Sequence, residues 1–257
     1  MLHKALSAVP GVEMHHEYAV QITQPLAVKR YLGVLTDEQT RTLLDETFGA
    51  AVRHAQGTHW GDSSNKLSWL VPDLAALFPQ ARFVHLVRDG RKVASSYFHK
   101  LGNETYDDRS NAALQAWYDG AGSPPPPEKP YWWPVPRRDD PAAKAFRGFD
   151  QFERIAWHWA EVNRVAMDAL AALDPARTLF TRLEDLSQNQ TKVRELFDFL
   201  KFPYQESHAA VFARPHNVNR PEDKLLTDVQ RAQFEAIATP MMARLGYAGT
   251  PEYVVAY

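Results

Sequence analysis

The hydrophobic positions along the chain repeat with two spacings, one typical of helices and one of buried strands. The capping-box pair Thr36 and Gln39 marks the start of one helix. Two short apolar runs rich in Val, Leu and Phe, 82–87 and 179–183, predict buried parallel strands. A third segment, 12–18, is compatible with a strand, and 57–64 is predicted to be a loop. Helical spacing predicts helices at 1–9, 36–55, 66–78, 91–101, 151–173, 190–200 and 228–244.

The order of these elements indicates the fold class. The strand at 82–87 is followed by Asp89 and Gly90 and then by a helix, which is half of a βαβ unit. No repeat and no linker between two cores is visible. The sequence therefore predicts one α/β domain over 1–257, with a parallel sheet covered by helices.

Residues 120–148 depart from both spacings. Their prolines exclude a regular helix or sheet, and their aromatic side chains argue against free disorder. We interpret 102–148 as an ordered lid, anchored by Tyr131, Trp132 and Trp133. The alternative is a polyproline ligand for a partner domain, but the aromatic residues interrupt such a ligand.

Composition and charge narrow the function classes. The net charge is −2 and the sequence contains no cysteine. The charge balance gives no reason to expect nucleic acid or an anionic membrane as partner, and the missing thiols exclude disulfides, thiolate catalysis and cysteine-based metal sites. No apolar run approaches the ~18 residues of a membrane span. The composition fits a reducing compartment, so we expect a cytoplasmic location.

Candidate chemistry is concentrated at residues 87–96. Arg88 follows a strand, where ligands of parallel sheets bind, and its guanidinium can hold a phosphate with two parallel hydrogen bonds. Ser96 lies eight residues later, in the next helix, where its hydroxyl could reach the same anion. Asp89 is placed as the N-cap and Gly90 to permit a tight turn. The alternative is a surface turn with a solvated arginine.

This segment resembles the 3′-phosphate-binding motif of PAPS-dependent sulfotransferases. That motif runs from a strand through Arg-Asp-Gly/Pro-Arg to a serine eight residues after the first arginine. Phe78-Pro79, Leu183 to Leu186 and the helix sequence at 194–203 are similar to the family as well. The resemblance implies a three-layer αβα fold of the P-loop NTPase-like type. It also implies transfer of a sulfuryl group from 3′-phosphoadenosine 5′-phosphosulfate (PAPS) to a hydroxyl or amine, with 3′-phosphoadenosine 5′-phosphate (PAP) as product and no metal.

The sequence departs from that family at its start. The Arg/Lys-Ser-Gly-Thr-Thr loop that cradles the 5′-phosphosulfate is absent, and Met1 falls where the helix after it should begin, so the first strand is expected to be missing too. Three explanations stay open: an incomplete N-terminus, a non-catalytic relative that binds nucleotide or a protein partner without turnover, and a different donor mode. A P-loop kinase is disfavoured because GxxxxGK[ST] is absent.

The resemblance also suggests catalytic residues. Glu17 matches the glutamate that acts as base in tyrosylprotein and heparan-type sulfotransferases, and His16 is the alternative because other branches use histidine. Lys66 is the candidate for the cation near the bridging oxygen, although the family's lysine position itself falls on Ser63. For each of these residues an ordinary surface role is the alternative.

The remaining binding candidates are less specific. Leu183 replaces the family's adenine-stacking tyrosine, so Trp60 could stack instead or simply belong to the core. Arg214 and Arg220, in a polar loop, could close over the phosphates. Tyr106, Trp117 and the three lid aromatics could line the pocket of a small-molecule, glycan or peptide acceptor. The acceptor's identity and the oligomeric state are not readable from the sequence.

Overall fold

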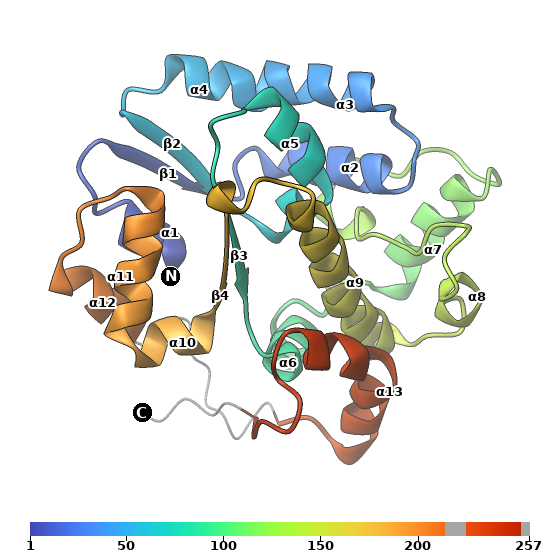
Figure 1. Cartoon of the computed structure of the whole chain (residues 1–257). Helices are drawn as coiled ribbons and strands as arrows, with labels where there is room; N and C mark the ends of the chain where they lie inside the picture. Colours follow the sequence, from blue (N-terminus) through green and yellow to red (C-terminus); the bar gives the residue numbers. More distant parts are fainter. Residues whose placement is uncertain (214–224, 253–257) are drawn as a thin grey trace.

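The chain forms a mixed α/β structure in which helices outnumber short parallel strands (Figure 1). The computed structural model describes residues 1–213 and 225–252. The strands of this part are β1 Val12–His16, β2 His59–Ser63, β3 Phe83–Val87 and β4 Thr178–Arg182. β1 pairs with β2 and β3 with β4, both in parallel. The predicted parallel pairing is confirmed, but within the described residues it forms two two-stranded sheets and not one central sheet.

Most predicted helices are present at the expected places. The helices are α1 Leu2–Leu6, α2 Val20–Tyr31, α3 Asp37–Leu44, α4 Ala50–His54, α5 Val71–Leu77, α6 Gly90–Lys100, α7 Asp108–Tyr118, α8 Ala143–Phe146, α9 Gln151–Ala171, α10 Leu183–Gln188, α11 Gln190–Leu200, α12 Glu206–Ala213 and α13 Asp228–Arg244. A π-helical turn at Asp45–Gly49 joins α3 to α4, and short 3₁₀ turns cover Asn65–Leu70, Lys129–Tyr131 and Pro175–Arg177.

Local sequence signals explain several helix boundaries. Thr36 forms the predicted capping box with Gln39 at the start of α3. The single helix predicted for 66–78 is instead a 3₁₀ turn followed by α5. Pro72 lies in the first turn of α5, where a missing N–H costs nothing, so the proline marks a helix start and not a helix interior.

Two elements, β2 and α2, differ from the sequence prediction because neither shows the regular hydrophobic pattern of its element type. The range 57–64 was predicted to be a loop, which is wrong: its centre is β2, held in parallel register by β1 from Val12↔His59 to His16↔Ser63. Helix α2 has no clear amphipathic pattern because consecutive residues from Thr23 to Val28 are all buried. A helix that is covered on most sides lacks the polar face on which periodicity arguments depend.

The strands lie between two hydrophobic clusters. Val84 and Leu86 of β3 pack on the smaller cluster, which α1, α10, α11 and α12 form. Alternate residues face the other way, since Phe83 and Val87 pack with the larger cluster and His85 contacts Asn163 of α9. Because side chains alternate along a strand, helices cover both faces of β3.

The proline-rich segment packs against this larger cluster. Trp132 and Trp133 are 2% and 4% exposed. The indole of Trp132 donates to Pro126 O at 2.7 Å, and that of Trp133 to Glu104 O at 2.6 Å. Both indoles thus satisfy their one polar group while they bury their rings.

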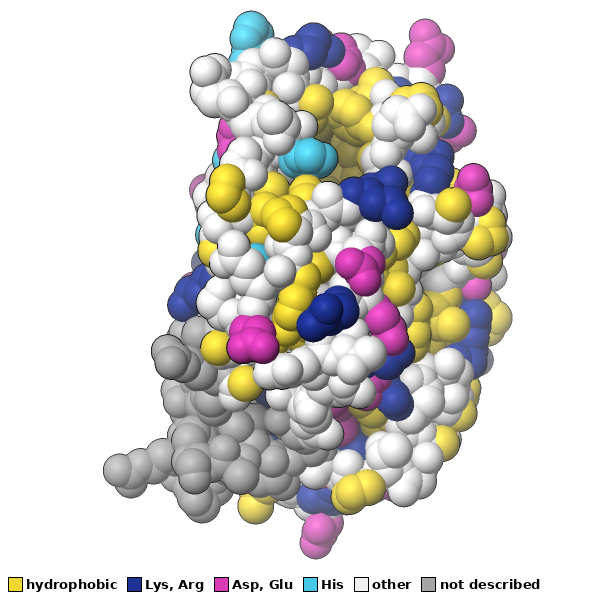
Figure 2. Space-filling view, turned by 60° about the vertical axis from the view of Figure 1, so that its left-hand side comes forward, with side chains coloured by type: hydrophobic (Ala, Val, Ile, Leu, Met, Phe, Trp, Pro, Cys, Tyr) yellow, Lys and Arg dark blue, Asp and Glu magenta, His cyan; other side chains and the backbone are white. Residues whose placement is uncertain are grey.

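Helix hydropathy and the charges on one face of the molecule bear on its possible partners. Among the described residues, no helix is long and apolar enough to cross a bilayer. On the face drawn in Figure 2, lysine and arginine side chains are interspersed with aspartate and glutamate among the residues shown in colour.

Candidate functional site

Glu17 and Lys66 meet because their strands are parallel and adjacent. Glu17 directly follows β1, and Lys66 lies three residues after the end of β2. The backbone N–H of Glu17 donates to Ser63 O at 3.2 Å, and Glu17 has a φ of 56°, in the left-handed region. Such a conformation is uncommon for a glutamate and turns its side chain out of the strand direction at this edge of the sheet.

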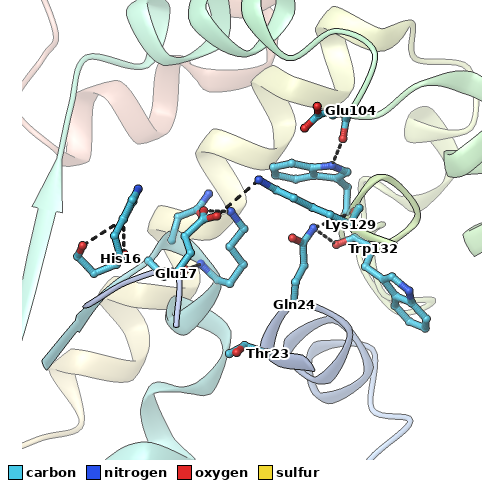
Figure 3. Close-up of polar contacts among 12 residues, drawn as sticks. His16, Glu17, Thr23, Gln24, Glu104, Lys129 and Trp132 are labelled. Carbon is cyan, nitrogen blue, oxygen red and sulfur yellow. Dashed lines mark hydrogen bonds and ion pairs between the residues drawn. The ribbon is translucent and has the colours of Figure 1, made fainter. Parts of the chain in front are cut away.

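The carboxylate of Glu17 contacts two ammonium groups. Lys66 Nζ donates to Glu17 Oε1, and Lys129 Nζ lies 3.5 Å from Glu17 Oε2. Figure 3 shows Lys129 reaching Glu17 from the proline-rich segment. The side chain of Lys66 is only 7% exposed and its Nζ lies 5.4 Å from the centre of the Trp133 ring. The site is therefore a partly buried cluster of one carboxylate and two cations.

Burial and charge oppose each other in this cluster. Burial alone would raise the pKa of the Glu17 carboxyl, but the ammonium groups of Lys66 and Lys129 outweigh it and hold the pKa below its usual value. Burial lowers the pKa of the Lys66 ammonium, and the Glu17 carboxylate offsets only part of this shift. Glu17 is thus ionised at neutral pH and is a weaker base than a free glutamate.

His16 lies next to Glu17 in sequence but points elsewhere. Its Nδ1 lies 2.8 Å from Ser63 O, and since a carbonyl only accepts, Nδ1 carries the proton. The side chain is exposed, and Nε2 keeps its lone pair. His15 is satisfied by other contacts, with Nε2 3.0 Å from Glu13 and its ring 5.1 Å from that of Trp60.

The helix that carries Ser96 reaches the neighbourhood of Lys66 through the next residue. Tyr97 Oη accepts a hydrogen bond from Asn65 Nδ2 at 2.9 Å, and Asn65 precedes Lys66. Burial raises the pKa of Tyr97 to about 12, and the Glu17 carboxylate adds to the shift. Residues 96–97 of α6 and residues 65–66 therefore belong to the same part of the molecule.

Arg88 stands at the carboxyl end of β3 with its guanidinium uncommitted. Within the described residues its side chain has no hydrogen-bond or ion-pair partner, and the same holds for the hydroxyl of Ser96. The backbone around Arg88 is fixed instead: Arg88 O accepts from Trp159 Nε1 at 3.2 Å, and Asp89 N donates to Glu184 Oε1 at 2.9 Å. Two free polar groups on a fixed strand–turn–helix fit an anion-binding site.

The turn residues of this motif act partly as expected. Asp89 is the N-cap of α6, accepting from Arg91 N at 2.9 Å. Gly90, however, is helical and does not have a positive φ. A Cβ at this position would lie 2.6 Å from atoms of both Trp159 and Phe234, so glycine is required for close packing and not for the turn.

The other candidate residues are not brought to this cluster. Trp60 packs edge-on against Tyr18 and Phe48, with centroids 5.3 and 5.6 Å apart. This is the core role that was the alternative for Trp60. Arg214 and Arg220 lie outside the described residues.

Part of the aromatic acceptor lining is corrected by the structure. Tyr106, Trp132 and Trp133 are buried in the core. Their polar atoms donate to backbone carbonyls inside the protein and not to a ligand. Lys129 was missed as a site residue; its only sequence signal was its position in the proline-rich segment assigned to the acceptor side. In the described part of the chain, no group of His, Asp and Glu side chains could hold a metal.

The chain was compared with solved structures, curated proteins and protein-family models. Among solved structures, the sulfotransferase domain from the curacin biosynthetic pathway is similar with a TM-score of 0.45 and 13% identity, over 93% of this chain and 98% of that one. No curated protein matches the chain. Residues 2–122, which include Glu17, Lys66, Arg88 and Ser96, match the model of the sulfotransferase family. The matched segment spans slightly less than half of the chain and contains the candidate residues for both the anion site and the ion-pair cluster.

Proposed function

We propose that the protein is a sulfotransferase that transfers a sulfuryl group from PAPS to a hydroxyl or amine. The observation that carries this proposal is the Arg88 guanidinium at the end of β3, followed in α6 by the Ser96 hydroxyl, neither of which has a partner among residues 1–213 and 225–252. A guanidinium matches a phosphate in shape and charge, and the hydroxyl adds a donor. In this proposal both bind the 3′-phosphate of the nucleotide, within the three-layer P-loop-like fold that the family resemblance implies.

The proposed chemistry is an in-line exchange at sulfur. The acceptor oxygen or nitrogen forms a bond to sulfur while the bond from sulfur to the bridging oxygen breaks, and PAP leaves with that electron pair. A base takes the proton of the acceptor. Negative charge grows on the bridging oxygen, which an ammonium group stabilises best when it is already in place. Lys66 is our candidate for that group, because its Nζ has three protons and Glu17 accepts only one.

Glu17 is the proposed base and His16 the alternative. Glu17 lies in the cluster with Lys66, but both of its carboxylate oxygens face ammonium groups, which weaken its basicity. His16 is exposed and keeps a lone pair on Nε2. The variants Glu17→Gln and His16→Gln separate the two candidates. Replacement of the true base should lower kcat about 10²–10⁴-fold, whereas the other replacement should keep most of the wild-type kcat.

The segment 102–148 is proposed as the acceptor-side wall of the site. Its support is Lys129, which reaches from this segment to Glu17, and the two buried tryptophans that fix the segment in place. A small-molecule, glycan or peptide acceptor would contact the exposed parts of this wall.

Titration of PAP into the protein by calorimetry tests the nucleotide site. We expect binding to the wild type and at least about a 10-fold weaker affinity for Arg88→Ala, because a charged hydrogen bond contributes about 1.5–3 kcal/mol. The matched control is Arg82→Ala, at the exposed residue just before β3. Absence of PAP binding to the wild-type protein, or equal loss in both variants, would contradict the proposal.

A second candidate is a nucleotide-binding protein without turnover. The observation that favours it is the Glu17 carboxylate, which is held by two cations and is a weakened base. A radiolabelled-PAPS transfer assay against pooled phenol, amine and sugar acceptors distinguishes the two candidates. PAP binding with transfer supports the enzyme, and PAP binding without transfer to any acceptor supports the second candidate.

A further inference from the structure

A small cavity lies beside Lys66, and its lining is mostly apolar with a few polar side chains. Its volume is about 10 Å³, and its polar lining residues are Gln24, Asn65, Lys66 and His158, with Trp69 and Trp133 among the apolar ones. This is about the space that one water molecule needs. An apolar cavity stays dry, whereas a site with two or more converging polar groups binds water, so the polar atoms of the lining decide its content.

The hydrogen bonds around His158 determine its tautomer. Tyr106 Oη lies 2.6 Å from Pro134 O, and since a carbonyl only accepts, the phenol proton is used there. His158 Nδ1 lies 3.1 Å from the same Oη, so Nδ1 must carry the proton that this contact needs. Nε2 of His158 therefore presents a lone pair, is buried, and has no partner among the described residues.

Gln24 presents a second unused acceptor. Its amide nitrogen donates to Trp132 O at 2.7 Å and to Lys129 O at 3.2 Å, which uses both amide protons. Its Oε1 is buried and, in the described part of the chain, has no partner. In Figure 3 this oxygen is turned away from Trp132, toward the side on which Glu17 lies.

Lys66 supplies the matching donor. It lines the same cavity and uses one of its three protons on Glu17. A single water molecule donates two protons and accepts at least one, which matches two lone pairs and one ammonium proton. Buried polar atoms without partners are unfavourable, so occupation by water is favourable.

We propose that the cavity binds one water molecule that accepts from Lys66 Nζ and donates to His158 Nε2 and Gln24 Oε1, and that His158 thereby positions Lys66. Burial, followed by the nearby Lys66 charge, lowers the pKa of His158 to about 3, so the imidazole stays a neutral acceptor at working pH. The groups that face it are Tyr106 Oη, Lys66 and the rings of Tyr97, Trp69 and Trp133. The catalytic meaning of this positioning rests on the proposed function, but the water site itself does not.

Two conservative variants separate the two nitrogens of His158. The amide nitrogen of an asparagine replaces Nδ1, and the amide of a glutamine reaches the place of Nε2. In His158→Asn the donor to Tyr106 is kept and the acceptor for the water is lost. In His158→Gln an acceptor for the water is kept. If His158 has only a structural role, His158→Asn, which keeps the contact with Tyr106, should perturb the protein less than His158→Gln. If His158 binds the water, His158→Asn should perturb the Lys66 ammonium more than His158→Gln does.

The test combines crystallography with NMR of the full chain. In a high-resolution wild-type crystal structure we expect one water within hydrogen-bond distance of all three atoms, retained in His158→Gln and lost in His158→Asn. The ¹H–¹⁵N signal of the Lys66 ammonium should be sharp in the wild type and in His158→Gln, and broadened beyond detection in His158→Asn. The control His85→Gln, at a half-buried histidine bonded to Asn163, should leave this signal unchanged.

Several outcomes would overturn the proposal. A dry cavity in a well-ordered crystal structure would do so, as would an unchanged Lys66 signal in His158→Asn. The ¹⁵N shifts of His158 in the wild type need no variant and cover the case in which a variant does not fold: a protonated Nε2 contradicts the site. If PAPS transfer is found, His158→Asn should lower kcat on the order of 10-fold with PAP affinity unchanged; failure of transfer altogether leaves the structural readouts intact and counts against the proposed function only.

Discussion

At the scale of single residues, the ion pair of Glu17 and Lys66 carries an electrostatic cost because both charged groups are removed from much of their solvent. A lysine with a side chain 7% exposed is expensive to keep charged, and a carboxylate at hydrogen-bond distance compensates for part of that cost. Removing one partner of such a pair costs more than the pair contributes, because the other charge stays buried. The pair is therefore a sensitive point for stability as well as for the proposed chemistry.

Replacement of Glu17 by glutamine tests this energetic argument. Glu17→Gln keeps the size of the side chain but leaves Lys66 without a compensating charge. We expect the free energy of unfolding at pH 7, from urea titration, to fall by about 1–3 kcal/mol. Glu13→Gln, in the strand β1 that precedes Glu17, is the control, since Glu13 pairs with His15 at a more exposed site and should change stability by about 0–1 kcal/mol. Equal effects of the two substitutions would contradict the assigned burial cost.

The same pair gives a pH dependence with a defined sign. The pKa of Glu17 in the folded protein lies below the value of 4.5 expected for the unfolded chain, because the two ammonium groups outweigh burial. Its stabilising contribution is therefore present above pH 4.5 and is lost as the pH falls through the folded-state pKa. Urea titrations from pH 7 to pH 3 should show the difference between wild type and Glu17→Gln shrinking in acid; a difference that stays constant would exclude the shift.

At the scale of elements, the turn between β3 and α6 depends on close packing. Gly90→Ala places a methyl group 2.6 Å from Trp159 and Phe234. Overpacking of this kind costs about 1–3 kcal/mol, and it should also weaken PAP binding because Arg88 lies two residues earlier. Thermal and urea unfolding measure the first effect. Gly148→Ala is the matched control, since its nearest neighbour would lie 3.6 Å away, and it should be nearly neutral.

The proline-rich segment depends on its two indole hydrogen bonds. Trp133→Phe keeps most of the buried ring but removes the donor to Glu104 O. The unpaired carbonyl should cost about 1–3 kcal/mol, and amide hydrogen exchange should rise across 126–135. Trp60→Phe, at a ring that packs against Tyr18 and Phe48, is the control and should leave exchange in that range unchanged. Exchange that is fast already in the wild type would show that the segment is not held as described.

The sequence predicted elements well where they carry a local signal, such as a capping pair or a short apolar run. The capping box at Thr36 and the apolar strands at 82–87 and 179–183 carry local signals, and each was confirmed. α2 and β2 carry none, since α2 is buried on most sides and β2, with the sequence HisTrpGlyAspSer, is defined by its pairing with β1. Glu17 and Lys66 could be named from a resemblance, but the contact with Lys129 depends on a segment 112 residues away and could not.

At the scale of the whole molecule, β3 ties the two hydrophobic clusters together. Its alternate side chains pack into one cluster and then the other, so neither cluster can open without exposing one face of β3. The bond from Glu184 to Asp89 N adds a link from the end of β4 to the turn after β3. We therefore expect 1–257 to unfold as one domain, as the sequence predicts.

Calorimetry of two core variants tests this cooperativity. Leu196→Ala opens the smaller cluster and Leu70→Ala the larger one; both leucines are 0% exposed, and each change should cost about 2–5 kcal/mol. If the clusters are coupled through β3, each variant lowers the midpoint of one shared transition, and the calorimetric and van't Hoff enthalpies agree. A transition that splits in two, with Leu196→Ala shifting only the lower one, would mean that α1 and α10–α12 form an independent unit. In that case β3 would have to keep its strand conformation with one face exposed to water, which its apolar residues Val84 and Leu86 make unfavourable.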